Sequence, residues 1–130
     1  MSVADLPPGQ LIALALEAIS ERASERLRPL LADDVVIVTG RSEHRGIEAA
    51  LAWSQRGYEY LDRRYRLSRL EARASGLLGT GRVEYVWRDS GEVGDSSPVF
   101  FGFQIRDGLL AMISLEDDID GAQRSLDAGS

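Results

Sequence analysis

The stretch from Gly81 to Asp118 constrains this chain most, because it reads as three successive strands of one antiparallel sheet, over residues 81–87, 97–108 and 109–118. Two turn signals containing Asp and Gly divide it, one over residues 89–92 and one over residues 106–108. In each strand every second residue is apolar, which is the pattern of a strand with one buried face. That face comprises Val83, Tyr85, Trp87, Val99, Phe101, Phe103, Ile105, Ala111, Ile113 and Leu115. Other parts of the chain are therefore expected to cover it.

The segments before this sheet predict three helices. An apolar stripe at helical spacing predicts an amphipathic helix from about Gln10. A short helix is expected over about Ser24–Leu31, with Ser24 as its N-cap and Pro29 tightening its end. A third helix begins at Ile47 and carries apolar and aromatic residues as far as Leu61. Its two aromatic faces are expected to pack against the sheet on one side and against a lid or second subunit on the other.

The remaining segments predict shorter pieces of sheet and connection. Residues 33–34, both Asp, are expected to turn the chain into a buried strand over residues 35–39. Residues 40–46 read as a polar loop. Residues 65–74 read as a strand whose buried face is ambiguous, and residues 75–80 as a glycine-bearing turn.

The length and composition of the chain limit the kinds of function that it can have. The 130 residues suggest one domain, 1–130, with an ordered core over about 10–120, and a tail with at most one helical turn capped by Asp118. The absence of cysteine excludes disulfides and thiolate chemistry, and one histidine makes a metal site unexpected. A net charge of −6 argues against nucleic acid or an anionic membrane as partner. All 15 basic residues are arginine, which suggests a bacterial source.

The chain begins without the features of a signal peptide, and it contains no apolar run of membrane-spanning length. A soluble, cytoplasmic protein is therefore expected. The order of predicted elements, with helices first and then several long antiparallel strands, indicates an α+β fold. In such a fold the sheet must curl around the helices to hide one face.

Four stretches of sequence resemble the SnoaL-like branch of the nuclear transport factor 2-like superfamily, which also contains the ketosteroid isomerases. They are LLADDVVIVTG, HRGIEAAL, RVEYVWRDSGEV and VFFGFQIRDGLLAMISLEDD, and the resemblance covers about residues 10–120. It implies a cone, in which a strongly curved mixed or antiparallel sheet wraps around the N-terminal helices and encloses a pocket. It also implies a homodimer formed through the outer face of the sheet.

The resemblance does not extend to the catalytic residues of the ketosteroid isomerases. Ketosteroid isomerases use a carboxylate base, a tyrosine and a protonated aspartic acid. This chain has Thr39, Ala15 and Phe101 at the corresponding positions, and these side chains cannot carry that proton transfer. The two strands with the clearest pattern have no inward carboxylate. This also disfavours the carboxylate–arginine–carboxylate arrangement of the epoxide hydrolases in the superfamily.

Tyr85 is the strongest polar candidate, because its inward position would let the phenol orient a ligand carbonyl or hydroxyl; the alternative is a core tyrosine with a satisfied hydroxyl. His44 is the only imidazole, yet it lies in a segment that is mostly a turn in the resembling family. Asp117 could sit at the cavity mouth or be solvated. Trp53, Tyr58 and Trp87 read as cavity wall or as plain core.

Two functions remain open. In the first, the cone holds a small apolar organic molecule and performs cofactor-free lyase, cyclase or isomerase chemistry. Its expected ligand-binding residues are Tyr85, Thr39, Trp53, Tyr58, Trp87, Phe101, Phe103, Ile113, His44 and Asp117. In the second, the protein is a non-catalytic dimerisation or assembly module whose cone is filled by Phe101, Phe103 and Trp87. Neither hypothesis requires a cofactor, a metal, a nucleic acid or a membrane.

Overall fold

The structure is a computed structural model that describes residues 5–40, 42–56 and 60–129. Its elements are α1 (Pro8–Ser20), α2 (Ser24–Leu27), a 3-10 turn (Arg28–Leu30), β1 (Leu31–Thr39), β2 (Glu43–Arg45), α3 (Ile47–Ser54), β3 (Leu61–Arg73), β4 (Gly76–Trp87), β5 (Val93–Arg106), β6 (Leu109–Glu116) and α4 (Ile119–Gly129). The expected α+β class is confirmed.

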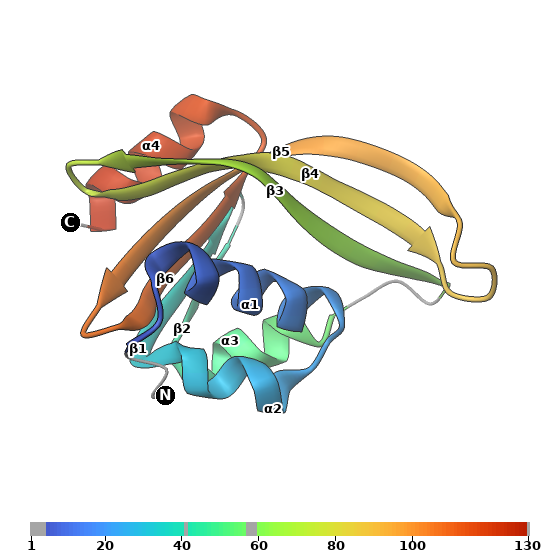
Figure 1. Cartoon of the computed structure of the whole chain (residues 1–130), viewed down its shortest axis with the longest axis horizontal. Helices are drawn as coiled ribbons and strands as arrows, with labels where there is room; N and C mark the ends of the chain where they lie inside the picture. The colour runs from blue at the N-terminus through green and yellow to red at the C-terminus, as the bar shows by residue number, and fades with distance from the viewer. Residues whose placement is uncertain (1–4, 41, 57–59, 130) are drawn as a thin grey trace.

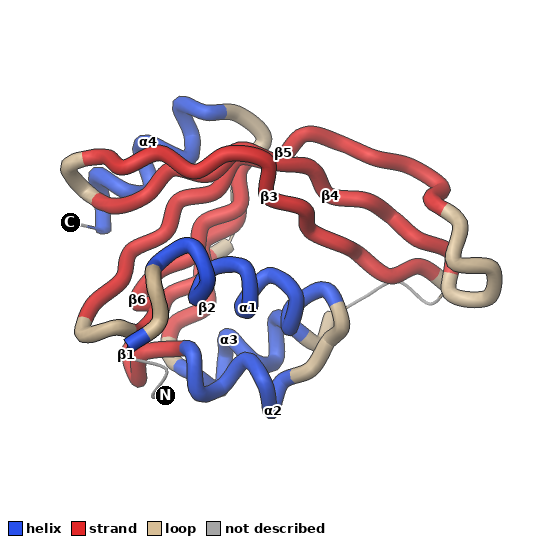
Figure 2. Tube along the Cα trace, viewed as in Figure 1, coloured by secondary structure: helices blue, strands red, loops and turns tan. Residues whose placement is uncertain are grey.

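The six strands form one mixed sheet in the order β2-β1-β6-β5-β4-β3. Strands β1 and β6 run parallel, and the other neighbours are antiparallel. Helices α1, α2 and α3 lie against the concave side, while α4 lies against the outer side (Figure 1). Strands β3, β4 and β5 bend together and extend beyond the helices (Figure 2). This is the curved sheet of the expected cone.

The bend has a local cause in β3 and β4. The pairing of these strands slips between Leu67 and Arg69, which is a bulge that increases twist and curvature. Opposite it, a Cβ atom at Gly81 would overlap the carbonyl oxygen of Arg66. A Cβ atom at Gly79 would lie 2.9 Å from the Leu67 side chain. Glycine is therefore required where the two strands approach most closely.

The core fills the helix-covered part of the concave side. Phe101 and Phe103 are fully buried on β5, and their rings stack with centroids 5.5 Å apart. The ring of Tyr65 on β3 meets Phe101 edge-on at 6.2 Å. The apolar stripe of α1 packs on the same cluster, as its spacing predicted, and its buried members are Leu11, Ile12, Ala15, Leu16, Ala18 and Ile19.

The C-terminal segment forms a helix over Ile119–Gly129, so the expectation of at most one helical turn was wrong. Its start is as predicted, because an Asp118 side-chain oxygen accepts a hydrogen bond from the Gly121 N–H at 2.6 Å. On α4, Ala122 and Leu126 are fully buried and form a second small core with Leu78 and Met112 on the outer face. Only these two residues of α4 are apolar and buried, which explains the weak sequence signal.

Several element boundaries also differ from expectation. Asp33 and Asp34 lie inside β1, where its pairing with β6 is irregular, and they form no turn. Ser24 is the first residue of α2, and Ala23 precedes it without a side-chain cap. The third helix ends already at Ser54.

The strands are longer than the sequence pattern indicated. Residues 76–80 belong to β4, and the supposed loop over 40–46 contains the short strand β2. A bulge in the β5–β6 pairing places Leu110 in the helix-covered core instead of Ala111. One extra residue in a strand reverses the face of the residues beyond it, so alternation alone assigned Ala111 wrongly.

Candidate ligand-binding site

A polar row of side chains crosses the concave face of the sheet where β3, β4 and β5 extend past the helices. Tyr85 on β4 pairs with Arg63 on β3 and with Asp95 on β5. Directly paired residues point to the same face of a sheet, so a guanidinium, a phenol and a carboxylate lie side by side. The neighbouring rows are mainly apolar, with Leu61 beside Trp87 and Tyr65 beside Val83.

Two hollows adjoin this row, and Tyr85 borders both of them. The first has a volume of about 230 Å³ and is lined by Arg63, Tyr65, Val83, Tyr85, Ser97, Pro98, Val99, Leu115, Glu116 and Asp117. The second has a volume of about 310 Å³ and is lined by Leu61, Tyr85, Trp87, Gly94 and Asp95. We call the two together the concave groove. A small molecule lying along it would pass Tyr85.

Arg63 connects the concave groove to α3. Its guanidinium carbon lies 5.6 Å from the ring centre of Trp53, which is a cation–π arrangement. Its Nη2 atom donates a hydrogen bond to the carbonyl oxygen of Arg56 at 2.8 Å. Trp53 is only 4% exposed, so it supports Arg63 from beneath and does not itself line the groove.

Thr39 and His44 lie behind Trp53. The Oγ1 atom of Thr39 is 2.8 Å from the Ser42 hydroxyl, which in turn is 3.0 Å from Nε2 of His44. The imidazole lies 6.4 Å from the Trp53 ring, centre to centre. His44 belongs to β2, not to a loop. Neither Thr39 nor His44 lines the concave groove, because Trp53 lies between them and the groove.

The other predicted site residues divide between groove and core. Asp117 lines the groove, while Phe101, Phe103 and Ile113 are completely buried in the core. Trp87 is 44% exposed and packs over Gly94. It therefore does not belong to the buried core and does not fill the interior of the cone. Tyr58 lies outside the described residues.

Arg63 and Asp95 were not among the site residues predicted from the sequence. Both lie in strand ends that the sequence pattern did not assign to strands, because β3 was expected to begin at Tyr65 and β5 at Ser97. The alternation of Leu61, Arg63 and Tyr65 is a signal that could have extended β3. Asp95 also shows that an inward carboxylate does exist on this face.

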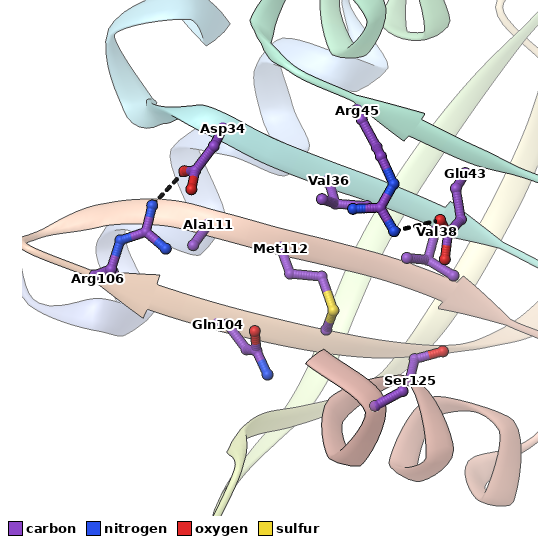
Figure 3. A pocket seen from close by; sticks show the side chains of 11 residues that line it. Asp34, Val36, Val38, Glu43, Arg45, Gln104, Arg106, Ala111, Met112 and Ser125 are labelled. Atoms are coloured by element: carbon purple, nitrogen blue, oxygen red, sulfur yellow. Dashed lines mark hydrogen bonds and ion pairs between the residues drawn. The ribbon is translucent and has the colours of Figure 1, made fainter. Parts of the chain in front are cut away.

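A third hollow lies on the outer face, between α4 and strands β1 and β2 (Figure 3). Its volume is about 430 Å³, and we call it the outer groove. Arg106 pairs with Asp34 at one end, and Arg45 pairs with Glu43 at 2.8 Å at the other. Apolar side chains lie between these ion pairs, namely Val36, Val38, Ala111 and Met112. Both of its arginines are thus already neutralised by carboxylates of the chain.

Residues 5–40, 42–56 and 60–129 lack two kinds of feature. This part of the chain contains no group of three or more His, Asp or Glu side chains positioned to hold a metal ion. None of its helices is long and apolar enough to cross a membrane.

Comparisons with known proteins find the fold but no close relative. No protein-family model and no curated protein matches the sequence. An LEH-like epoxide hydrolase from M. tuberculosis is 18% identical, with a TM-score of 0.67 over 92% of this chain and 89% of that one. An NTF2-like protein from Burkholderia pseudomallei is 14% identical, with a TM-score of 0.69 over 95% and 97%.

A protein from Catenulispora acidiphila with a ketosteroid isomerase-like fold, solved with trimethylamine, is 12% identical. Its TM-score is 0.69 over 85% of each chain. Identities this low carry the fold and not the activity. The resemblance stated from sequence is therefore confirmed at the level of fold, and the chain has the cone fold of the NTF2-like proteins.

Proposed function

We propose that this protein binds a small, mainly apolar organic molecule in the concave groove. The observation that carries the proposal is the position of Tyr85, which borders both adjoining hollows and lies between Arg63 and Asp95. Apolar walls with a few convergent polar groups are typical of small-molecule sites. Tyr85 would orient a polar group of the ligand, while Val83, Val99 and Trp87 contact its apolar part.

Any chemistry in the groove would be cofactor-free lyase, cyclase or isomerase work that relies on positioning. Asp117, which directly follows β6 and lines the first hollow, is the candidate base. Thr39 and His44 would act only through Trp53 and Arg63, as positioning residues. Structural neighbours that include an epoxide hydrolase and a trimethylamine complex support a small-molecule role for this fold.

Native mass spectrometry of freshly purified protein, compared with its denatured mass, tests the proposal. A retained small molecule is the expected result, and its extra mass identifies the chemical class. The variant Tyr85→Phe should retain less of it. If the native mass matches the bare chain and a broad metabolite library yields no binder, the proposal fails.

A second candidate function is a non-catalytic homodimeric module, and the filled part of the cone favours it. Phe101 and Phe103 are completely buried in the interior, as that hypothesis expects, although Trp87 does not join them. The chain's own α4 covers part of the outer face. A dimer through that face would therefore use the outer groove, whose ends each carry one acid and one base.

Sedimentation analysis tests this second candidate. We expect a dimer that the substitution Val36→Asp dissociates, because Val36 lies on the floor of the outer groove. Binding in the concave groove should survive the same substitution. A monomeric wild-type chain at micromolar concentration would reject the homodimer.

A further inference from the structure

Two arginines among the described residues are half-buried, and they differ in their partners. Arg22 forms an ion pair with Asp62, with 3.3 Å between nitrogen and oxygen. Arg63 has no carboxylate oxygen of the described chain within 4.0 Å of its guanidinium. Partly removing a charge from water is unfavourable unless an opposite charge compensates it. Arg63 is thus a cation whose counter-charge the described chain does not supply.

The existing contacts of Arg63 hold it in place without neutralising it. The Arg56 carbonyl accepts one hydrogen bond, and Trp53 supports the guanidinium through its ring. A guanidinium carries five N–H donors in a planar fork that fits a carboxylate. One donor is used in the hydrogen bond to the Arg56 carbonyl, so the other donors can bind a ligand in the groove that Arg63 lines.

We propose that the ligand of the concave groove is a small organic anion whose carboxylate binds Arg63. This inference rests on the proposed function and names its ligand class. The apolar body of the anion extends past Tyr85 toward Trp87 and Leu61, which line the adjoining hollow. A half-exposed tryptophan at that end, 44% accessible, offers an aromatic surface for the apolar body.

The groove also contains carboxylates, which would favour a cation instead. Asp95 lies on the far side of Tyr85, and its side chain accepts a hydrogen bond from the Ser96 N–H at 2.8 Å. Asp117 is exposed at the edge of the first hollow. Both are more exposed than Arg63 and therefore better compensated by water. A third carboxylate, that of Glu116, also lines the first hollow and is half-buried, but it accepts a hydrogen bond from the Ser125 hydroxyl of α4 at 3.0 Å, on the outer side of the sheet. The half-buried guanidinium of Arg63 should therefore decide whether the groove prefers a negatively or a positively charged ligand.

The test uses three probes that share one ring system and differ in charge: 1-naphthoate, 1-naphthamide and 1-naphthylmethylammonium. Isothermal titration calorimetry at low salt should show the acid binding at least about tenfold more tightly than the amide. Equal binding of acid and amide, or tighter binding of the ammonium, would overturn the inference and leave the proposed function intact. Failure of all three to bind would count against both.

Substitutions test whether Arg63 causes the preference for the acid over the amide. Arg63→Gln should remove the preference for the acid, while Arg63→Lys should keep part of it because the charge remains. Arg64→Gln is the matched control, since this exposed neighbour on β3 points to the opposite face and carries the same charge. Circular dichroism should show all three variants folded. A preference that persists in Arg63→Gln would also overturn the inference.

Discussion

The two ends of the concave face show how one sequence pattern gives two results. At the helix-covered end, Phe101 and Phe103 stack beneath α1 and leave no exposed surface. At the free end, Tyr85 and Trp87 occupy the same alternation but border open hollows. The difference lies in what covers the strands, since α1–α3 end short of the tips of β3, β4 and β5 (Figure 1). Alternation therefore identifies the inner face, and coverage decides whether that face is core or binding surface.

The largest effect should come from Phe101→Ala. This residue is fully buried and touches both Phe103 and Tyr65, so its loss leaves a cavity. We expect a decrease of about 3–5 kcal/mol in the free energy of unfolding, measured by urea denaturation. Trp87→Ala, on the same face at the free end, should cost about 1 kcal/mol or less. Similar costs at both positions would remove the proposed difference between the two ends.

The sequence predicts which residues face inward wherever apolar residues alternate along a strand without a break. Residues 99–105 alternate without interruption, and Phe101 and Phe103 face inward as expected. Prediction failed at the β5–β6 bulge, which moved Ala111 to the other face, because a bulge depends on strand pairing and not on residue type.

The site was less predictable than the fold, because its charges come from strand ends. Arg63 and Asp95 gain their positions by pairing with Tyr85, a register that is set by the bend of the whole sheet. Nothing in the polar segments around them signals that pairing. Tyr85 and Asp117, both predicted as site residues, line the same hollow, whereas His44 and Thr39 lie behind Trp53.

The next largest effect should come from Leu126→Ala. This substitution measures how much the small core on the outer face stabilises the protein, compared with the core on the concave face. Leu126 is fully buried between α4 and the sheet, so its truncation should cost about 2–4 kcal/mol by urea denaturation. Arg124→Ala, exposed on the same helix, should change stability by about 0.5 kcal/mol or less. A Leu126 variant as stable as the Arg124 variant would mean that α4 does not hold the outer core.

Tyr85→Phe should separate binding from stability at the free end. The substitution keeps the ring and removes only the hydroxyl, so the packing beside Val83 is retained. We expect the affinity for a groove ligand to fall by about five- to tenfold, since a hydrogen bond to a ligand contributes about 1 kcal/mol. The melting temperature should change little. Unchanged affinity would remove Tyr85 from the site, and a large loss of stability would assign it to the core instead.

The smallest effect should come from Asp117→Asn, and its direction depends on the sign of the ligand. Asp117 is exposed and lines the same hollow as Arg63, so its negative charge opposes an anion there. Removing that charge should tighten 1-naphthoate binding by about two- to threefold at low salt. The gain should vanish at high salt, because screening acts on exposed charges.

Asp107→Asn supplies the control for that measurement. Asp107 carries the same charge in the β5–β6 turn, at the opposite end of β6 from Asp117, and its positive φ of 55° is a conformation that asparagine tolerates. It should leave naphthoate affinity unchanged. If Asp117→Asn instead weakens naphthoate binding while Asp107→Asn does not, Asp117 does not act on the ligand as an opposing charge, and the ligand is not an anion held beside Asp117 in the first hollow.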